Sequence, residues 1–104
     1  MNKIILRKRV PVKLVIESFQ QYRMKLIDIV GLAQNLSTAM SLLEGDIPKP
    51  VRDSIVWAEA QIDSIRFGIN ERKEPAEVAK VWRELEEVIT RHDAPGREDE
   101  EETR

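Results

Sequence analysis

The chain contains no cysteine, which excludes disulfide bonds, thiolate metal sites and cysteine nucleophiles. The absence of cysteine fits a reducing compartment, and we expect a cytoplasmic protein. No apolar run approaches the ~20 residues that a membrane-spanning helix needs, so no membrane partner is expected.

Histidine and glycine are also scarce. There is one histidine, His92, and the four glycines are scattered at Gly31, Gly45, Gly68 and Gly96. Zinc sites combine several histidine or cysteine ligands, and phosphate-binding loops need clustered glycines. The acidic residues lack the Glu-x-x-His spacing of carboxylate-bridged metal sites in helical bundles. We therefore predict a protein that is not an enzyme, with no catalytic residues, no metal and no cofactor.

What the chain does have is charge, unevenly distributed. Its 104 residues suffice for one domain, and 35% charged with 41% hydrophobic residues is typical of a globular protein. The net charge of −2 is the sum of two opposite regions. Residues 1–25 hold seven basic residues and one acid, a charge of +6, and the other 79 residues carry −8. The two regions are suited to different partners, or to each other.

Residues 1–11 are predicted to form a basic extended arm or edge strand. Apolar and basic residues mostly alternate over residues 4–13, with Ile5 and Lys8 as exceptions, and period-two alternation is typical of a half-buried strand. Whether the segment is a strand or an extension of the following helix stays open. Its basic side chains either protect an edge or contact phosphates of nucleic acid. The candidates for nucleic-acid binding are Lys3, Arg7, Lys8, Arg9 and Lys13.

The strongest pattern is a heptad stripe that predicts one helix over residues 12–44. Ten apolar positions alternate in spacings of three and four, as in a coiled-coil seam. They are Val12, Val15, Phe19, Tyr22, Leu26, Ile29, Ala33, Leu36, Met40 and Leu43. At 1.5 Å per residue this helix would be about 50 Å long, with Gly31 as a weak point where a bend or close approach is expected. Residues 29–43 contain no charge, so we expect other helices or another copy to surround them.

Two further helices are predicted over 49–70 and 75–92, before a disordered acidic tail over 93–104. Gly45, Pro48 and Pro50 mark the turn before the first of these helices. That helix carries two nearly opposite apolar stripes, which indicates packing on both sides. One stripe contains Val51, Ile55, Ala58, Ile62, Ile65 and Ile69, and the other contains Trp57, Ala60, Ser64 and Phe67. The fold class is all-α: a three-helix bundle-like unit with one long N-terminal helix.

These patterns favour a small interaction or assembly module that self-associates through apolar helix faces. We expect a homodimer or higher homo-oligomer, with a further protein partner also compatible with the pattern, because a long uncovered apolar seam promotes association. The predicted interface residues are Ile29, Leu32, Leu36, Met40, Leu43, Trp57 and Phe67. The alternative is a dimeric nucleic-acid-binding regulator that uses the basic N-terminal segment.

Overall fold

The computed structural model describes residues 5–68 and 72–93, and every regular element within them is helical. A 3-10 turn, η1 (Leu6–Lys8), precedes four α-helices. These are α1 (Val10–Arg23), α2 (Ile29–Ser41), α3 (Lys49–Gly68) and α4 (Glu74–His92). The all-α prediction is confirmed. None of the helices in these two ranges is long and apolar enough to cross a membrane.

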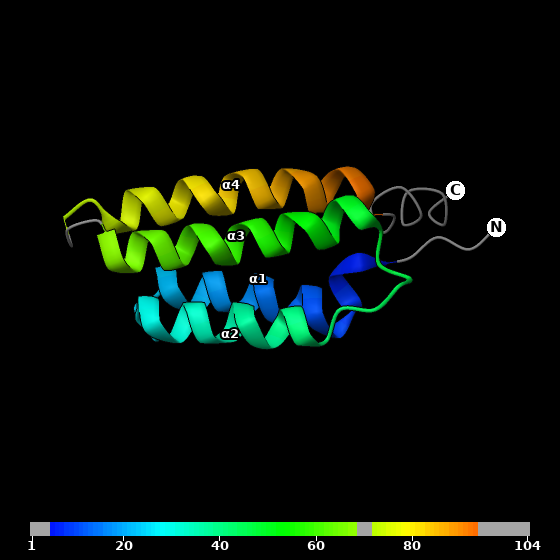
Figure 1. Ribbon diagram of the computed structural model, residues 1–104, viewed down its shortest axis with the longest axis horizontal. Helices are drawn as coiled ribbons and strands as arrows, with labels where there is room; N and C mark the ends of the chain where they lie inside the picture. Colours follow the sequence, from blue (N-terminus) through cyan, green and yellow to red (C-terminus); the bar gives the residue numbers. More distant parts are fainter. Residues whose placement is uncertain (1–4, 69–71, 94–104) are drawn as a thin grey trace, which may run out of the picture.

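The four helices lie side by side as two hairpins (Figure 1). Helices α1 and α2 form one layer, and α3 and α4 form the other. Backbone packing is close within each hairpin and between α2 and α3. The backbones of α1 and α4 approach each other less closely, so large side chains have to bridge that side of the bundle.

The predicted helix over 12–44 is two helices, because the chain turns between Arg23 and Ile29. The Leu26 amide donates to the Gln21 carbonyl at 2.8 Å, and the Lys25 amide donates to the Tyr22 carbonyl at 3.0 Å. This pair of hydrogen bonds is a Schellman motif, which ends a helix with one left-handed residue. Lys25 is that residue, with a φ of 65°. The three-helix prediction is corrected accordingly to four helices.

Helix α2 begins with a side-chain cap at Asp28. Its Oδ1 accepts a hydrogen bond from the Gly31 amide at 3.0 Å, which satisfies one of the free N–H groups of the first turn. Ile27 and Leu32 occupy the two positions of a hydrophobic staple, and both belong to the core or pack against it. Gly31 therefore lies in the first turn of a new helix. A Cβ added there would lie 3.2 Å from the Cβ of Ile27, so the close approach is to the preceding turn.

Folding back brings both halves of the heptad stripe to one core. The α1 half contributes Val12, Val15 and Phe19, and the α2 half contributes Ile29, Ala33 and Leu36, all of them buried. The inner stripe of α3 and the apolar side of α4 complete the core. Their buried members are Val51, Ile55, Ala58, Ile62 and Ile65 of α3, and Val78, Val81, Leu85 and Ile89 of α4. A 50 Å helix would have left much of this seam in water.

The N-terminal segment is docked on the bundle, and its described part contains no strand. Leu6 is fully buried, and its amide donates to Asp93 Oδ1 at 2.9 Å. Arg7 Nε lies 2.8 Å from Asp93 Oδ2. The extended arm predicted over 1–11 is thus corrected from residue 5 onward, and residues 1–4 lie outside the described part.

The tail prediction is corrected at its first residue. Asp93 follows the last turn of α4 as its C-cap and is 7% exposed. Residues 94–104 lie outside the described residues. The other helix boundaries lie close to those expected, since α3 ends at Gly68 and α4 begins at Glu74.

Candidate functional site

Most of the predicted interface residues on the long helix lie inside the chain's own core. Ile29 is 8% exposed, and Leu32 and Leu36 are fully buried. Met40 and Leu43 are partly buried and pack against the same core. Ile29, Leu32 and Leu36 are therefore not available to a second copy, whereas Met40 and Leu43 keep part of their surface exposed. Trp57 and Phe67, on α3, stay at the surface.

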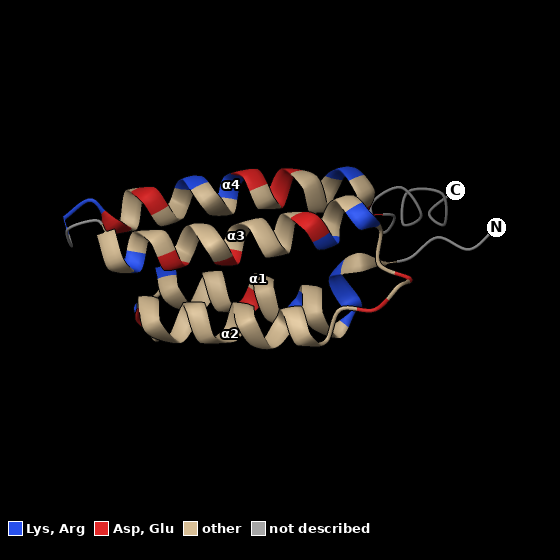
Figure 2. Cartoon of the chain, in the orientation of Figure 1, with Lys and Arg blue, Asp and Glu red and all other residues tan. Residues whose placement is uncertain are grey.

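The outer side of α2 is exposed and carries no charge. It presents Val30, Gln34, Ser37, Thr38 and Ser41 to solvent. In Figure 2 the whole of α2 is free of basic and acidic residues, in contrast to α3 and α4. The Thr38 hydroxyl donates to the Gln34 carbonyl at 3.1 Å, and the Ser41 hydroxyl donates to the Thr38 carbonyl at 2.7 Å. Because the Thr38 and Ser41 hydroxyls already have partners, covering them does not leave these two donors unpaired.

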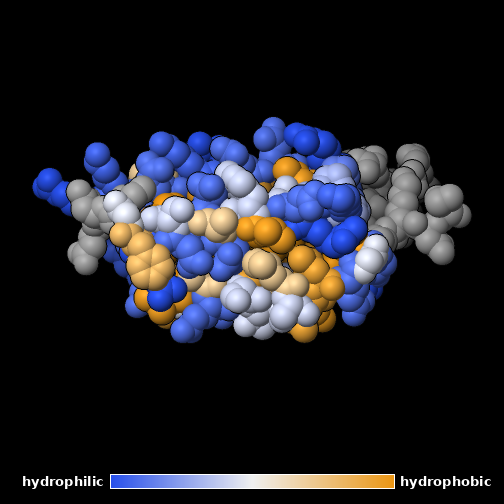
Figure 3. All heavy atoms as spheres, in the orientation of Figure 1, coloured by the Kyte–Doolittle hydropathy of each residue, from blue (hydrophilic) through white to orange (hydrophobic). Residues whose placement is uncertain are grey.

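The neighbouring outer side of α3 is partly apolar. Val56 is 46% exposed, Phe67 is 76% exposed, and Ala60 lies between them on the same helix face. The Arg66 guanidinium lies 4.5 Å from the centre of the Phe67 ring. Figure 3 shows apolar atoms gathered at the centre of this view, where α3 and α2 adjoin. We call this surface the α2–α3 face, made of Val30, Gln34, Ser37, Thr38, Ser41, Val56, Ala60 and Phe67.

The basic N-terminal residues do not form a free patch. Arg7 pairs with Asp93 and also donates to the Thr90 hydroxyl at 2.9 Å. Arg9 pairs with Asp46 at 2.6 Å and with Glu44 at 3.2 Å. Lys8 and Lys13 are exposed, and Lys3 lies outside the described residues. Two of the five predicted phosphate contacts are therefore occupied by acids of the same chain.

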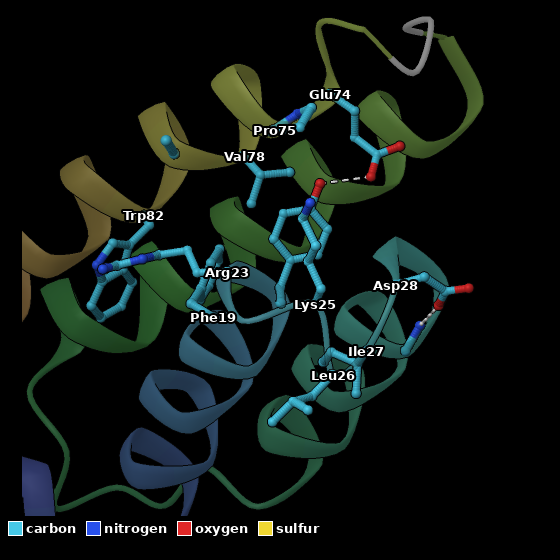
Figure 4. Close-up of a pocket in the computed structure, with 13 residues that line it drawn as sticks. Phe19, Arg23, Lys25, Leu26, Ile27, Asp28, Glu74, Pro75, Val78 and Trp82 are labelled. Atoms are coloured by element: carbon cyan, nitrogen blue, oxygen red, sulfur yellow. Dashed lines mark hydrogen bonds between the residues drawn. The ribbon is translucent and has the colours of Figure 1, made fainter.

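A cavity of about 710 Å³ opens between the end of α1 and the start of α4 (Figure 4). The turn between α1 and α2 forms its third wall. Its lining is mostly apolar and comes from Phe19, Leu26, Ile27, Pro75, Val78, Ala79 and Trp82. The cavity lies on the side of the bundle where the α1 and α4 backbones do not pack closely.

Two side-chain contacts bridge α1 and α4 at this cavity. The rings of Phe19 and Trp82 stack with centroids 5.1 Å apart and planes 29° apart. The Tyr22 hydroxyl donates to Glu74 Oε2 at 2.6 Å. Burial raises the pKa of Tyr22 well above its usual value, and the hydrogen bond to Glu74 and its negative charge act in the same direction. Tyr22 therefore remains a protonated donor to Glu74.

The charged groups of the cavity differ in whether they have partners. Asp28 accepts from the Gly31 amide, and Glu74 accepts from Tyr22. Arg23 and Lys25 also line the cavity, and neither side chain makes a hydrogen bond or ion pair within the part of the chain that the structure describes. Each carboxylate thus has one hydrogen-bond donor from the chain, whereas the two exposed cations have no partner among the described residues. The sequence did not reveal this site, because its residues come from two stretches far apart in the chain, 19–31 and 74–82, and form no motif.

Glu59 and Asp63 are neighbouring acids on α3. Burial raises the pKa of Glu59, and the hydrogen bond to Asp63 and its negative charge raise it further. Asp63 also lies 3.7 Å from Arg66. Within residues 5–68 and 72–93, no group of three or more histidine, aspartate or glutamate side chains is placed to hold a metal ion.

Comparison with protein-family models, with curated proteins and with solved structures found no match to this chain.

Proposed function

We propose that this protein is a non-enzymatic helical interaction module that binds a second copy of itself through the α2–α3 face. One observation carries the proposal: α2 has 13 residues, none of them charged, and its outer side is exposed. In a chain with 35% charged residues, a solvent-facing helix side would be expected to carry several charges. A side without charge is suited to burial against a protein surface.

The absence of charge on the outer side of α2 favours a second copy as the partner. In a two-fold dimer the same patch meets itself, so any net charge on it would face a like charge. The α2 part of the face has no such charge. Val30, Val56 and Phe67 supply exposed apolar area, and each Å² removed from water contributes about 25 cal/mol.

The test is the concentration dependence of molar mass, measured by sedimentation equilibrium from about 1 to 500 µM. The diagnostic variant is Val56→Glu, which places a charge at the centre of the face on a side chain that is already 46% exposed. Val10→Glu is the matched control. Val10 is 65% exposed at the first position of α1 and outside the α2–α3 face.

We expect the wild-type chain and Val10→Glu to form dimers with the same dissociation constant. Val56→Glu is expected to weaken the dimer at least tenfold, because two buried like charges would meet across the two-fold axis. A wild-type chain that stays monomeric at 500 µM would overturn the proposal. Equal effects of the two variants would also overturn it, because the α2–α3 face would then not be the interface.

Nucleic-acid binding through the N-terminal segment is the weaker alternative. It requires Arg7 and Arg9 to leave Asp93, Glu44 and Asp46 before they contact phosphates. Only Lys8 and Lys13 among the described candidates are exposed without such an ion pair. Two lysines give few phosphate contacts, and phosphate contacts set the strength of non-specific binding.

A further inference from the structure

We propose that the cavity between α1 and α4 binds an amphipathic carboxylate, a molecule with an apolar body and one carboxylate group. The proposal is independent of self-association, because none of its residues belongs to the α2–α3 face. It rests on three observations: the size of the cavity, its aromatic and aliphatic lining, and two cations at it that have no partner among residues 5–68 and 72–93.

The size and lining of the cavity suit an apolar body. Its volume of about 710 Å³ lies within the roughly 300–1,000 Å³ of small-molecule sites, which are mostly apolar with few polar groups. The stacked rings of Phe19 and Trp82 form one wall, and Val78 and Ile27 provide aliphatic surface. Ala79 is a small residue in the same lining, so it leaves space that a larger side chain would occupy.

Two cations and two carboxylates line the cavity, and the two exposed cations are the groups left to receive a ligand's carboxylate. Asp28 is engaged by the first turn of α2, and Glu74 is engaged by Tyr22. Arg23 and Lys25 have no such engagement among the described residues. Figure 4 shows the Arg23 side chain extending from α1 toward Trp82, beside the apolar wall. A guanidinium binds a carboxylate through two parallel hydrogen bonds, which neither an alcohol nor an amine can reproduce.

The Schellman turn places Lys25 at the cavity, whose wall includes Phe19 and Trp82. Its left-handed backbone reverses the chain and brings Leu26 and Ile27 to the same cavity. The turn therefore supplies one cation and two apolar side chains together. A straight helix over 12–44 would have separated these residues from α4.

The experiment uses the two tryptophans of the chain. Trp82 lines the cavity, whereas Trp57 lies on α3 outside it, so Trp57→Phe leaves Trp82 as the only tryptophan. This variant is titrated with 10-bromodecanoate, whose bromine quenches a tryptophan in contact. Decanoate and 1-naphthoate compete as straight-chain and aromatic carboxylates. Decanol tests the apolar body without the anion, and acetate tests the anion without the apolar body. Every ligand is used below its micelle-forming concentration.

We expect saturable quenching of Trp82, reversed by decanoate or naphthoate and much less by decanol or acetate. The stronger competitor shows whether the site prefers a straight-chain or an aromatic carboxylate. The double variant Arg23→Gln, Lys25→Gln is expected to weaken decanoate binding about tenfold or more, as loss of charge-assisted hydrogen bonds does. Lys13→Gln is the control, because it removes a positive charge from an exposed α1 residue outside the cavity.

A third variant tests whether the ligand occupies the volume of the cavity. Ala79→Leu is expected to weaken binding of every apolar ligand, and because Ala79 is exposed on α4, circular dichroism should show an unchanged fold. The proposal is overturned if quenching does not saturate at millimolar ligand. It is also overturned if decanol competes as well as decanoate, or if the double glutamine variant binds like Lys13→Gln.

Discussion

The carboxylate of Asp93 joins the two ends of the folded chain by accepting the backbone amide of Leu6 at 2.9 Å. The same carboxylate pairs with Arg7 at 2.8 Å. Asp93 is 7% exposed and Leu6 is fully buried, so the contact lies within the protein. A short N-terminal segment is thereby fixed to the end of α4, 87 residues later in the sequence.

Replacing Asp93 with alanine should lower the free energy of unfolding by about 2 kcal/mol, measured by urea denaturation. The substitution leaves the buried Leu6 amide without this acceptor, and an unpaired buried donor costs about 1–3 kcal/mol. The partly exposed Arg7 adds less, because solvent screens it. Asp53→Ala is the control. It breaks the exposed pair with Lys49 and should change stability by less than about 0.5 kcal/mol. Equal losses in the two variants would contradict the role of Asp93.

Lys25→Gly should raise the free energy of unfolding by about 0.5–1 kcal/mol. Lys25 has a φ of 65°, where its Cβ crowds the backbone, and glycine adopts this conformation without that cost. Chemical denaturation of the purified variant measures the difference. Lys13→Gly, inside α1, is the comparison and should lower stability by about 1 kcal/mol. A loss of stability in Lys25→Gly would mean that the left-handed turn is not formed in solution.

Glu59→Gln should raise the melting temperature at pH 7, with a smaller difference at lower pH. The raised pKa of Glu59 means that the folded state holds this proton more tightly than the unfolded state. Its contribution to stability is therefore present below the usual pKa of 4.5 and is lost as pH rises through the raised value. Glutamine removes the repulsion from Asp63 and keeps a hydrogen-bonding group.

Thermal unfolding followed by circular dichroism at pH 4, 5, 6 and 7 measures this trend. Glu87→Gln is the control, since Glu87 is exposed on α4 and lies 3.9 Å from Arg91. A constant difference across this pH range would contradict the coupling between Glu59 and Asp63.

Double-stranded oligonucleotides should bind the chain only weakly, with a dissociation constant above about 100 µM at 150 mM salt. The ion pairs of Arg7 and Arg9 with acids of the same chain leave too few free cations near the N-terminus. Fluorescence anisotropy with random oligonucleotides measures this directly. Micromolar binding that Lys8→Gln and Lys13→Gln abolish would instead support the nucleic-acid alternative.

Much of the bundle is predictable from local signals. Glycine and prolines around residues 45–50 place the start of α3, and Pro75 with the charge pairs that follow places α4. The inner stripe of α3 is buried as its periodicity predicts. Its second stripe, with Trp57 and Phe67, is at the surface, because α2 and α4 already cover the rest of the helix.

The break between α1 and α2 has a weaker signal. No glycine or proline lies between Arg23 and Asp28, and the three–four spacing of apolar residues continues through the turn. Asp28 is a preferred N-cap residue, and its position before the uncharged run is the one local sign of a new helix. Spacing within a stripe does not distinguish one long helix from two helices that face the same core.

The helical class, the apolar stripes and the uncharged character of residues 29–43 follow from residue order and local backbone preference alone. Tertiary structure decided which stripe faces inward, since burying the long seam within one chain removes more apolar surface from water than leaving it exposed. The tertiary structure also determines which basic side chains have acidic partners. Arg7 and Arg9 found acids far along the chain, and Arg23 and Lys25 were brought beside the α1–α4 cavity without partners among the described residues.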